Sequence, residues 1–132
     1  MNDDRARRLR DHLAFGASVP FVWGVVDCSL WVCDWIAAER GHDPAVHLRS
    51  TYDDGASCSR LLTREGGLVA LASRLADDSG LPETPNPVTG DVGVIETRLG
   101  PFLMICAGQR WACKTMRGVL FTPARVVKAW AV

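Results

Sequence analysis

The chain has 132 residues, 48% of them hydrophobic, and its 15 basic residues equal its 15 acidic residues in number. This length and hydrophobicity suit one domain with a buried core, so we expect a single domain over residues 1–132. A formal net charge of zero argues against a protein that binds nucleic acid through a basic surface. The local exception is interpreted as the solvated face of a helix and consists of Arg5, Arg7, Arg8 and Arg10.

A first helix is predicted over residues 5–14, with an aspartate at position 3 or 4 as its cap. After a short extended segment at 21–24, a second helix is predicted over Cys28–Arg40. Its apolar residues lie almost all round, which is typical of a central helix buried on most sides. Asp27 and Gly41 occupy the positions expected of its N-cap and C′ residue.

The second half of the chain is predicted to change from helix to strand. Residues 42–60 are polar, with a tight turn expected at 53–55, and residues 61–75 predict one helix interrupted at Gly66-Gly67 or two short helices. A proline-containing loop at 79–90 then leads into strands, predicted at 91–97, 102–107, 109–114 and 125–130. This order indicates an α+β domain in which N-terminal helices pack on a small antiparallel sheet.

Cysteine and histidine usage limits the chemistry. The odd number and irregular spacing of the cysteines make a poor disulfide framework and favour a reducing compartment. No zinc pattern and no phosphate-binding glycine loop occurs, so we expect neither a metal nor a cofactor. No apolar run approaches the ~18 residues of a membrane span. The charged N-terminus argues against a signal peptide, and we expect synthesis in the cytoplasm. The cysteines are Cys28, Cys33, Cys58, Cys106 and Cys113.

Cys28 is the candidate nucleophile because it begins the predicted central helix. The dipole and free N–H groups of a helix N-terminus lower the pKa of a thiol, and the thiolate is the reactive form. Cys33 lies in mid-helix and Cys106 in an apolar strand, so neither has this advantage. The alternative is that Cys28 is simply a small buried hydrophobic residue.

Two motifs in chain order resemble the NlpC-type, papain-like cysteine peptidases. The run Val19-Pro20-Phe21-Val22-Trp23-Gly24, followed by Asp27-Cys28-Ser29, is similar to the family's Pro-Tyr-x-Trp-Gly-Gly segment leading into Asp-Cys-Ser-Gly. The run Pro87-Val88-Thr89-Gly90-Asp91-Val92 resembles the Pro-Gly-Asp-Leu loop before the first central strand. The resemblance implies a papain-like NlpC-type fold and cleavage of peptidoglycan peptides by a Cys–His pair. It makes Cys28 the nucleophile position and places Trp23, Asp27 and Ser29 at the binding site.

The sequence departs from the family where the catalytic base should be. The strand that follows the Gly-Asp loop normally begins with the histidine, and Phe102 stands in its place. No histidine occurs after His47, and no His, Asn or Gln lies in residues 111–114, where the third polar residue is expected. His42 or His47 could supply a base by folding back over Cys28, although both lie in polar loop sequence that favours the surface.

Short members of this group that end in a strand like Ala129-Trp130-Ala131-Val132 resemble proteins coded in the tail modules of phages and gene-transfer agents. The resemblance implies a virion or phage-like tail component that docks on tail hub or baseplate proteins. With five tryptophans in the chain, Trp111 and Trp130 are candidate interface anchors, with burial in the core as the alternative. Two further alternatives remain for the protein as a whole, an active peptidoglycan peptidase or amidase and a module that binds the peptide without cutting it.

Overall fold

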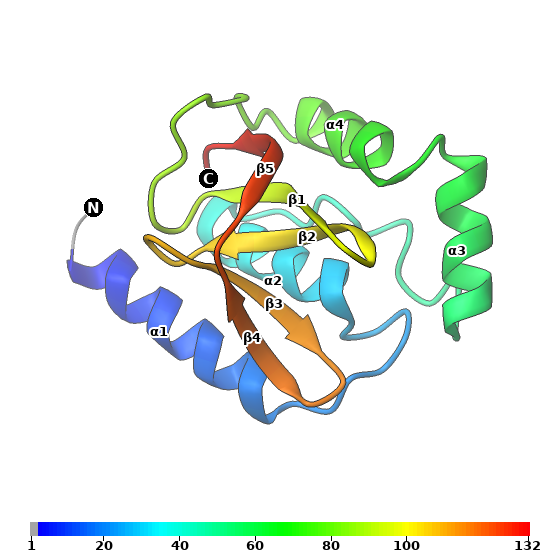
Figure 1. The fold of residues 1–132 in the computed structure, drawn as a ribbon, viewed down its shortest axis with the longest axis horizontal. Helices are drawn as coiled ribbons and strands as arrows, with labels where there is room; N and C mark the ends of the chain where they lie inside the picture. Colours follow the sequence, from blue (N-terminus) through cyan, green and yellow to red (C-terminus); the bar gives the residue numbers. More distant parts are fainter. Residues whose placement is uncertain (1–2) are drawn as a thin grey trace.

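The computed structural model describes residues 3–132 and confirms an α+β architecture. Within this range four helices pack on a five-stranded antiparallel sheet (Figure 1). The helices are α1 (Asp3–Ser18), α2 (Cys28–Arg40), α3 (Gly55–Arg64) and α4 (Leu68–Asp78). The strands are β1 (Val92–Thr97), β2 (Gly100–Cys106), β3 (Trp111–Thr115), β4 (Gly118–Thr122) and β5 (Arg125–Trp130). None of the helices in residues 3–132 has the length and apolar character that a bilayer span requires.

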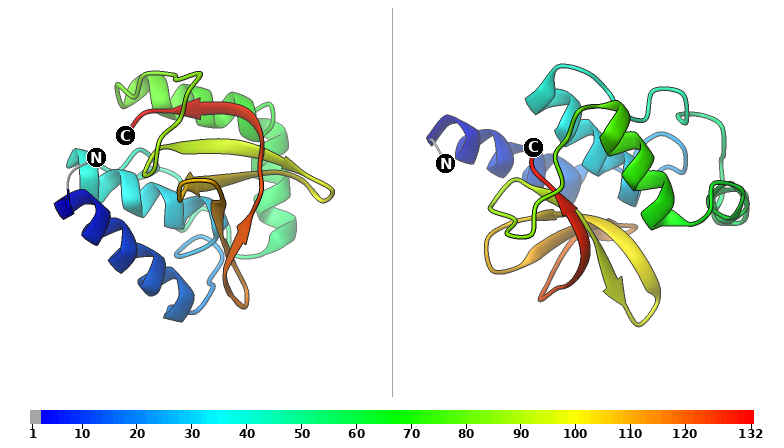
Figure 2. Two further views of the ribbon diagram at one scale, coloured as in Figure 1. Left: turned by 60° about the vertical axis from the view of Figure 1, so that its left-hand side comes forward. Right: turned by 90° about the horizontal axis from the view of Figure 1, so that it is seen from above.

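Helix α2 has the predicted bounds and the predicted caps. Asp27 accepts a hydrogen bond from the backbone N–H of Leu30, and Gly41 adopts the left-handed conformation with φ 82° that ends the helix. Trp31 and Trp35 are 0% and 1% exposed, because α2 packs on β2 and β3 of the sheet with α1 beside it (Figure 2). The central, nearly all-round apolar helix is therefore confirmed.

Helix α3 corrects the prediction for the middle of the chain. The expected turn at 53–55 is the start of this helix, which Asp54 caps in a reciprocal pair of hydrogen bonds with Ser57. Polar capping residues indicate a turn and a helix start equally well, so the sequence did not separate the two. The chain then breaks at Gly66-Gly67, both with positive φ, which gives two helices rather than one.

The sheet has the strand order β4-β3-β2-β1-β5, with every neighbouring pair antiparallel. Strand β5 has its predicted bounds, and β1, β2 and β3 lie within two residues of theirs. Strand β4 was not predicted at all. Its residues Gly118–Thr122 include Leu120 and Phe121, which are 55% and 43% exposed, so this edge strand lacks the alternation of buried and exposed residues that indicates a strand.

The sheet is rolled rather than flat. Its outer strands β4 and β5 are consecutive in the chain, and Pro123-Ala124 alone connects them. The edges of a flat five-stranded sheet would be roughly 19 Å apart. Three Cα steps can bridge only about 11 Å, so the two edges must converge. Ala124 packs against a cluster on the inside of this roll, formed by Ile95, Met104, Cys106, Trp111, Cys113 and Ala129.

The two tryptophans proposed as interface anchors lie inside the protein. Trp111 is 5% exposed within the roll, and Trp130 is 2% exposed in the core between the helices and the sheet. Neither presents its ring to a partner, so this part of the prediction is wrong and the core alternative holds. Strand β5 lies at the edge of the sheet, but α4 packs beside it and covers Trp130 near its end. The sequence alone does not indicate this contact.

Asp91, from the Gly-Asp motif, is a structural anchor at the start of β1. Its Oδ2 accepts from the backbone N–H of Val88 at 2.9 Å, and its Oδ1 accepts from the N–H of Val132 at 3.1 Å. The adjacent carbonyl of Gly90 accepts from the indole N–H of Trp35 at 2.8 Å. The motif therefore joins the loop, the C-terminal residues and α2 around one buried carboxylate, which is 4% exposed.

Candidate functional site

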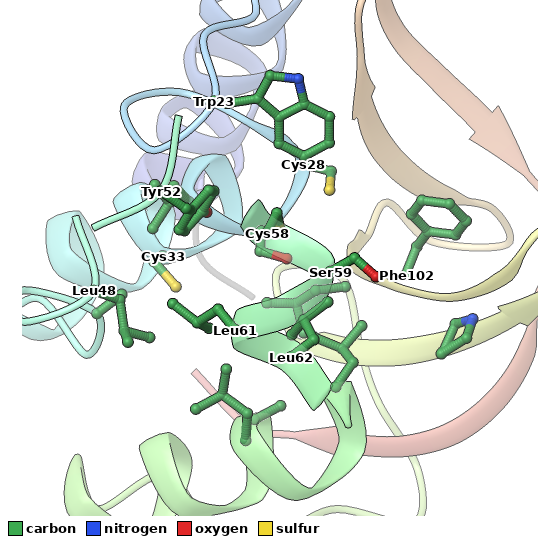
Figure 3. Close-up of a pocket in the computed structure, with 18 of the residues that line it drawn as sticks. Trp23, Cys28, Cys33, Leu48, Tyr52, Cys58, Ser59, Leu61, Leu62 and Phe102 are labelled. Carbon is green, nitrogen blue, oxygen red and sulfur yellow. The ribbon is translucent and has the colours of Figure 1, made fainter. Parts of the chain in front are cut away.

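Cys28 is the first residue of α2, where the helix meets the rolled sheet. Its side chain is half-buried and packs, together with Phe102 from β2, against the cluster inside the roll. Figure 3 shows Cys28 between the rings of Trp23 and Phe102, all three facing one cavity. The sequence predicted that Cys28 and Phe102 would belong to one site, and the structure brings them together.

The expected activation of the Cys28 thiol is not present. Burial raises the pKa of Cys28, and the neighbouring Asp27 carboxylate raises it further, while hydrogen bonds from Ser29 and from the helix backbone lower it only in part. The expectation that the helix N-terminus would favour the thiolate is therefore wrong here. The Asp27 side chain already caps that terminus and places a negative charge beside the sulfur.

Asp27 is the centre of a buried hydrogen-bond network that sequence reasoning found only in part. The residue is 1% exposed, and its Oδ2 accepts from the hydroxyl of Tyr52 at 2.5 Å and from the backbone N–H of Gly24 at 3.0 Å. Burial and the hydrogen bond to Asp27 raise the pKa of the Tyr52 phenol strongly. Tyr52 was missed because it lies in the loop after α2; being the only tyrosine of the chain was the available signal.

Gly24 makes this network possible through its conformation. Its φ is +78°, and a Cβ at this position would overlap the carbonyl oxygen of Tyr52. The Gly24 carbonyl in turn accepts from the backbone N–H of Ser50 at 2.9 Å. The segment before α2 and the loop after it are thus fastened side by side, with Asp27 enclosed between them. Asp27 acts as a structural cap and does not line the cavity.

None of the three histidines, all of which lie in the described part of the chain, is placed to serve Cys28 as a base. His12 stacks on the Trp31 ring at 4.9 Å between centroids, and burial lowers the pKa of its imidazole. His42 follows the C-terminal end of α2, roughly 20 Å from Cys28 at about 1.5 Å per residue. His47 is exposed and does not line the cavity. The side chain that faces the cavity beside Cys28 from β2 is the apolar ring of Phe102 (Figure 3).

Strand β3, where the third polar residue was expected, provides none to the cavity. Cys113 lies inside the roll near Cys28, and burial raises its pKa to about 12. Lys114 is 2% exposed and donates to the carbonyl of Val19 at 2.7 Å, so it fastens β3 to the segment after α1. Neither side chain can orient a general base, because none of the described residues that line the cavity is a histidine or a carboxylate.

The cavity beside Cys28 has a volume of about 450 Å³ and a predominantly apolar lining. Its walls come from α2, the loop at residues 45–52, α3, α4 and the hairpin between β1 and β2. Of the predicted binding residues, Trp23 and Ser29 contribute to it. In residues 3–132 no group of three or more His, Cys, Asp or Glu side chains is arranged to hold a metal ion.

The whole chain, residues 1–132, matches one protein-family model, described as a domain of unknown function, DUF6950. The chain therefore belongs to the DUF6950 family. No curated protein and no solved structure matches it.

Proposed function

We propose that this DUF6950 domain is a non-catalytic structural or accessory component of a phage or phage-like tail tip. In this proposal it is built on an NlpC-type, papain-like scaffold whose peptidase chemistry has been lost, and it docks on tail hub or baseplate proteins. The tail assignment rests on the resemblance of the motifs and of the C-terminal strand. The loss of catalysis rests on the surroundings of Cys28.

Three features support the scaffold. A cysteine begins a buried helix that faces an antiparallel sheet, which is the arrangement that the motif at Trp23–Ser29 implies. The Gly90-Asp91 pair opens the first strand of that sheet. The helices also precede the strands in the order of the family.

The observation that carries the non-catalytic assignment is the pairing of Cys28 with Phe102. A cysteine nucleophile needs a base that removes its proton or a setting that lowers its pKa. The ring of Phe102 can do neither, and burial together with Asp27 raises the pKa of the thiol. General-base assistance is typically worth ~10²–10⁴ in rate, so its loss removes most of the hydrolytic power of such a site.

Particles assembled with variant chains test the proposal. Cys28→Ser is expected to assemble as well as the wild type and to leave wall digestion and infectivity or gene transfer unchanged. Cys58→Ser is a matched control, because Cys58 is also half-buried and lines the same cavity. Particles that lack the chain should fail to assemble a complete tail tip.

Two results would overturn the proposal. Loss of wall digestion in Cys28→Ser alone, with thermal unfolding unchanged, would establish the alternative of an active peptidoglycan peptidase or amidase. Absence of the chain from purified, complete particles by mass spectrometry would remove the tail-tip role.

A further inference from the structure

We propose that the cavity under α3 is a binding site for a small, uncharged apolar molecule, of the class represented by long-chain alcohols. Its volume of about 450 Å³ lies within the range of roughly 300–1,000 Å³ found for small-molecule sites. This site does not depend on the tail-tip assignment, because it follows from the lining of the cavity and the position of α3.

The lining fixes the chemical class of the ligand. Leucine is the most frequent residue in it, with members from α3, α4 and the loop at 45–52, and the rings of Trp23 and Phe102 also line it. None of the described residues that line the cavity carries a charge, so a carboxylate, phosphate or ammonium group inside would lack a counter-charge. The Tyr52 hydroxyl is already bonded to Asp27 and that of Ser29 to the Cys28 thiol, which leaves the Ser59 hydroxyl at the rim available to a single hydroxyl of the ligand.

Helix α3 gives the cavity its outer wall. It is amphipathic, and Cys58, Leu61 and Leu62 point into the cavity (Figure 3). Figures 1 and 2 show α3 at the margin of the molecule, standing off from the sheet. Apolar side chains that face a void lose dispersion contacts, and an apolar ligand between α3 and the body of the protein would restore them. The consecutive positive-φ residues Gly66-Gly67 follow α3 and allow its position to adjust.

The exposed members of the lining mark where the cavity opens. Gly55 and Ser59 lie in the first half of α3, while Leu99 and Pro101 lie at the β1–β2 hairpin, and all four are exposed. Leu99 is 88% exposed and lines the cavity, so it places an apolar side chain at the rim. A ligand therefore enters between α3 and this hairpin, and its far end reaches the leucines of α4.

The same lining argues against a peptidoglycan peptide as the ligand. Such peptides carry carboxylates and many amide groups, and each amide buried without a hydrogen-bond partner is unfavourable. The cavity offers them few polar partners. Muropeptides are therefore the appropriate comparison ligand, because these polar peptides differ from the proposed apolar ligand chiefly in polarity.

Fluorescence titration of the full chain with N-phenyl-1-naphthylamine, an uncharged apolar dye, tests the site. Binding is expected to saturate at one dye per chain and to be reversed by dodecanol but not by muropeptides. Leu62→Trp, which fills the cavity, should weaken dye binding by roughly tenfold or more. Leu120→Trp is the matched control on the exposed face of β4, and its affinity should stay within about twofold of the wild type.

Ser59→Trp is a second test that remains informative if Leu62→Trp fails to fold, because it places the same bulk at the exposed rim. It should weaken dye binding with circular dichroism and thermal unfolding like those of the wild type. Absence of saturable dye binding to the wild type would overturn the proposal, as would equal affinities of Ser59→Trp and Leu120→Trp. Displacement of the dye by muropeptides and not by dodecanol would also overturn it, in favour of a polar ligand.

Discussion

Replacing Tyr52 with phenylalanine removes the hydroxyl that donates to Asp27 Oδ2 at 2.5 Å and leaves the buried ring in place. A hydrogen bond to a charged group contributes about 1.5–3 kcal/mol to the free energy of unfolding. Asp27 keeps its donors at Gly24 and Leu30, so a value near the middle, about 2 kcal/mol, is expected for the loss. Phenylalanine has no polar group that would be buried without a partner, so this substitution should lower the free energy of unfolding by less than the removal of Asp27 would.

Urea denaturation followed by tryptophan fluorescence measures this loss. With a urea dependence of about 1–3 kcal/mol per molar for small proteins, a loss of 2 kcal/mol lowers the midpoint by roughly 1 M. Ser18→Ala is the control: it removes an exposed hydroxyl that donates to Phe15 O at 3.2 Å and should change stability by less than about 0.5 kcal/mol.

A double-mutant cycle with Asp27→Ala separates the hydroxyl–carboxylate interaction from other effects of each change. The coupling free energy between the two sites is expected to be roughly 1–2 kcal/mol. A midpoint for Tyr52→Phe that equals that of Ser18→Ala, or a coupling energy of zero, would refute the assignment of Asp27 and Tyr52 as the anchor of the α2 N-terminus.

Three further predictions follow from the same region. The pKa of Tyr52 is raised in the folded protein, so the stability that its protonated phenol contributes is full below the ordinary phenol pKa of about 10 and is lost at higher pH. The phenolate absorbance of this single tyrosine should therefore appear only as the protein unfolds. A reversible titration near pH 10 with native tryptophan fluorescence would contradict this. Phe102→His should raise the iodoacetamide reactivity of Cys28 near neutral pH by roughly tenfold or more, measured by peptide mass spectrometry, whereas Phe102→Leu should not. Gly24→Ala should lower the free energy of unfolding by roughly 2–4 kcal/mol in the same urea assay, because the new Cβ overlaps the Tyr52 carbonyl oxygen and φ at this position is positive. A loss below about 1 kcal/mol would mean that the segment before α2 and the loop after it separate easily.

Local signals predicted the elements whose boundaries depend on neighbouring residues. The caps of α2 at Asp27 and Gly41 and the break at Gly66-Gly67 depend on backbone chemistry that acts within a few positions. The same local signals were ambiguous at Asp54, where one capping residue serves a turn or a helix, and they were absent in the exposed strand β4.

Contacts between residues far apart in the chain could not be predicted from the sequence. The contact of Tyr52 with Asp27 joins residues 25 positions apart and depends on how the loop after α2 returns to its N-terminus. The burial of Trp111 depends on the roll of the sheet, and that of Trp130 on the packing of α4 beside β5, and neither follows from the residue's neighbours in the sequence. The sequence identified Cys28 and Phe102 as members of one site, but the sign of the thiol's pKa shift required the burial and the position of the Asp27 carboxylate.

The pH dependence of Cys28 alkylation tests the proposed loss of catalysis most directly. Iodoacetamide labelling of the folded chain, with the modified cysteine located by peptide mass spectrometry, reports the thiolate fraction at that one position. The surroundings of Cys28 predict a rate that is slow at neutral pH and still rising above the pKa of a free cysteine, about 8.5. A rate that reaches its plateau below about pH 7, selectively at Cys28, would mean an activated nucleophile and would contradict the non-catalytic assignment.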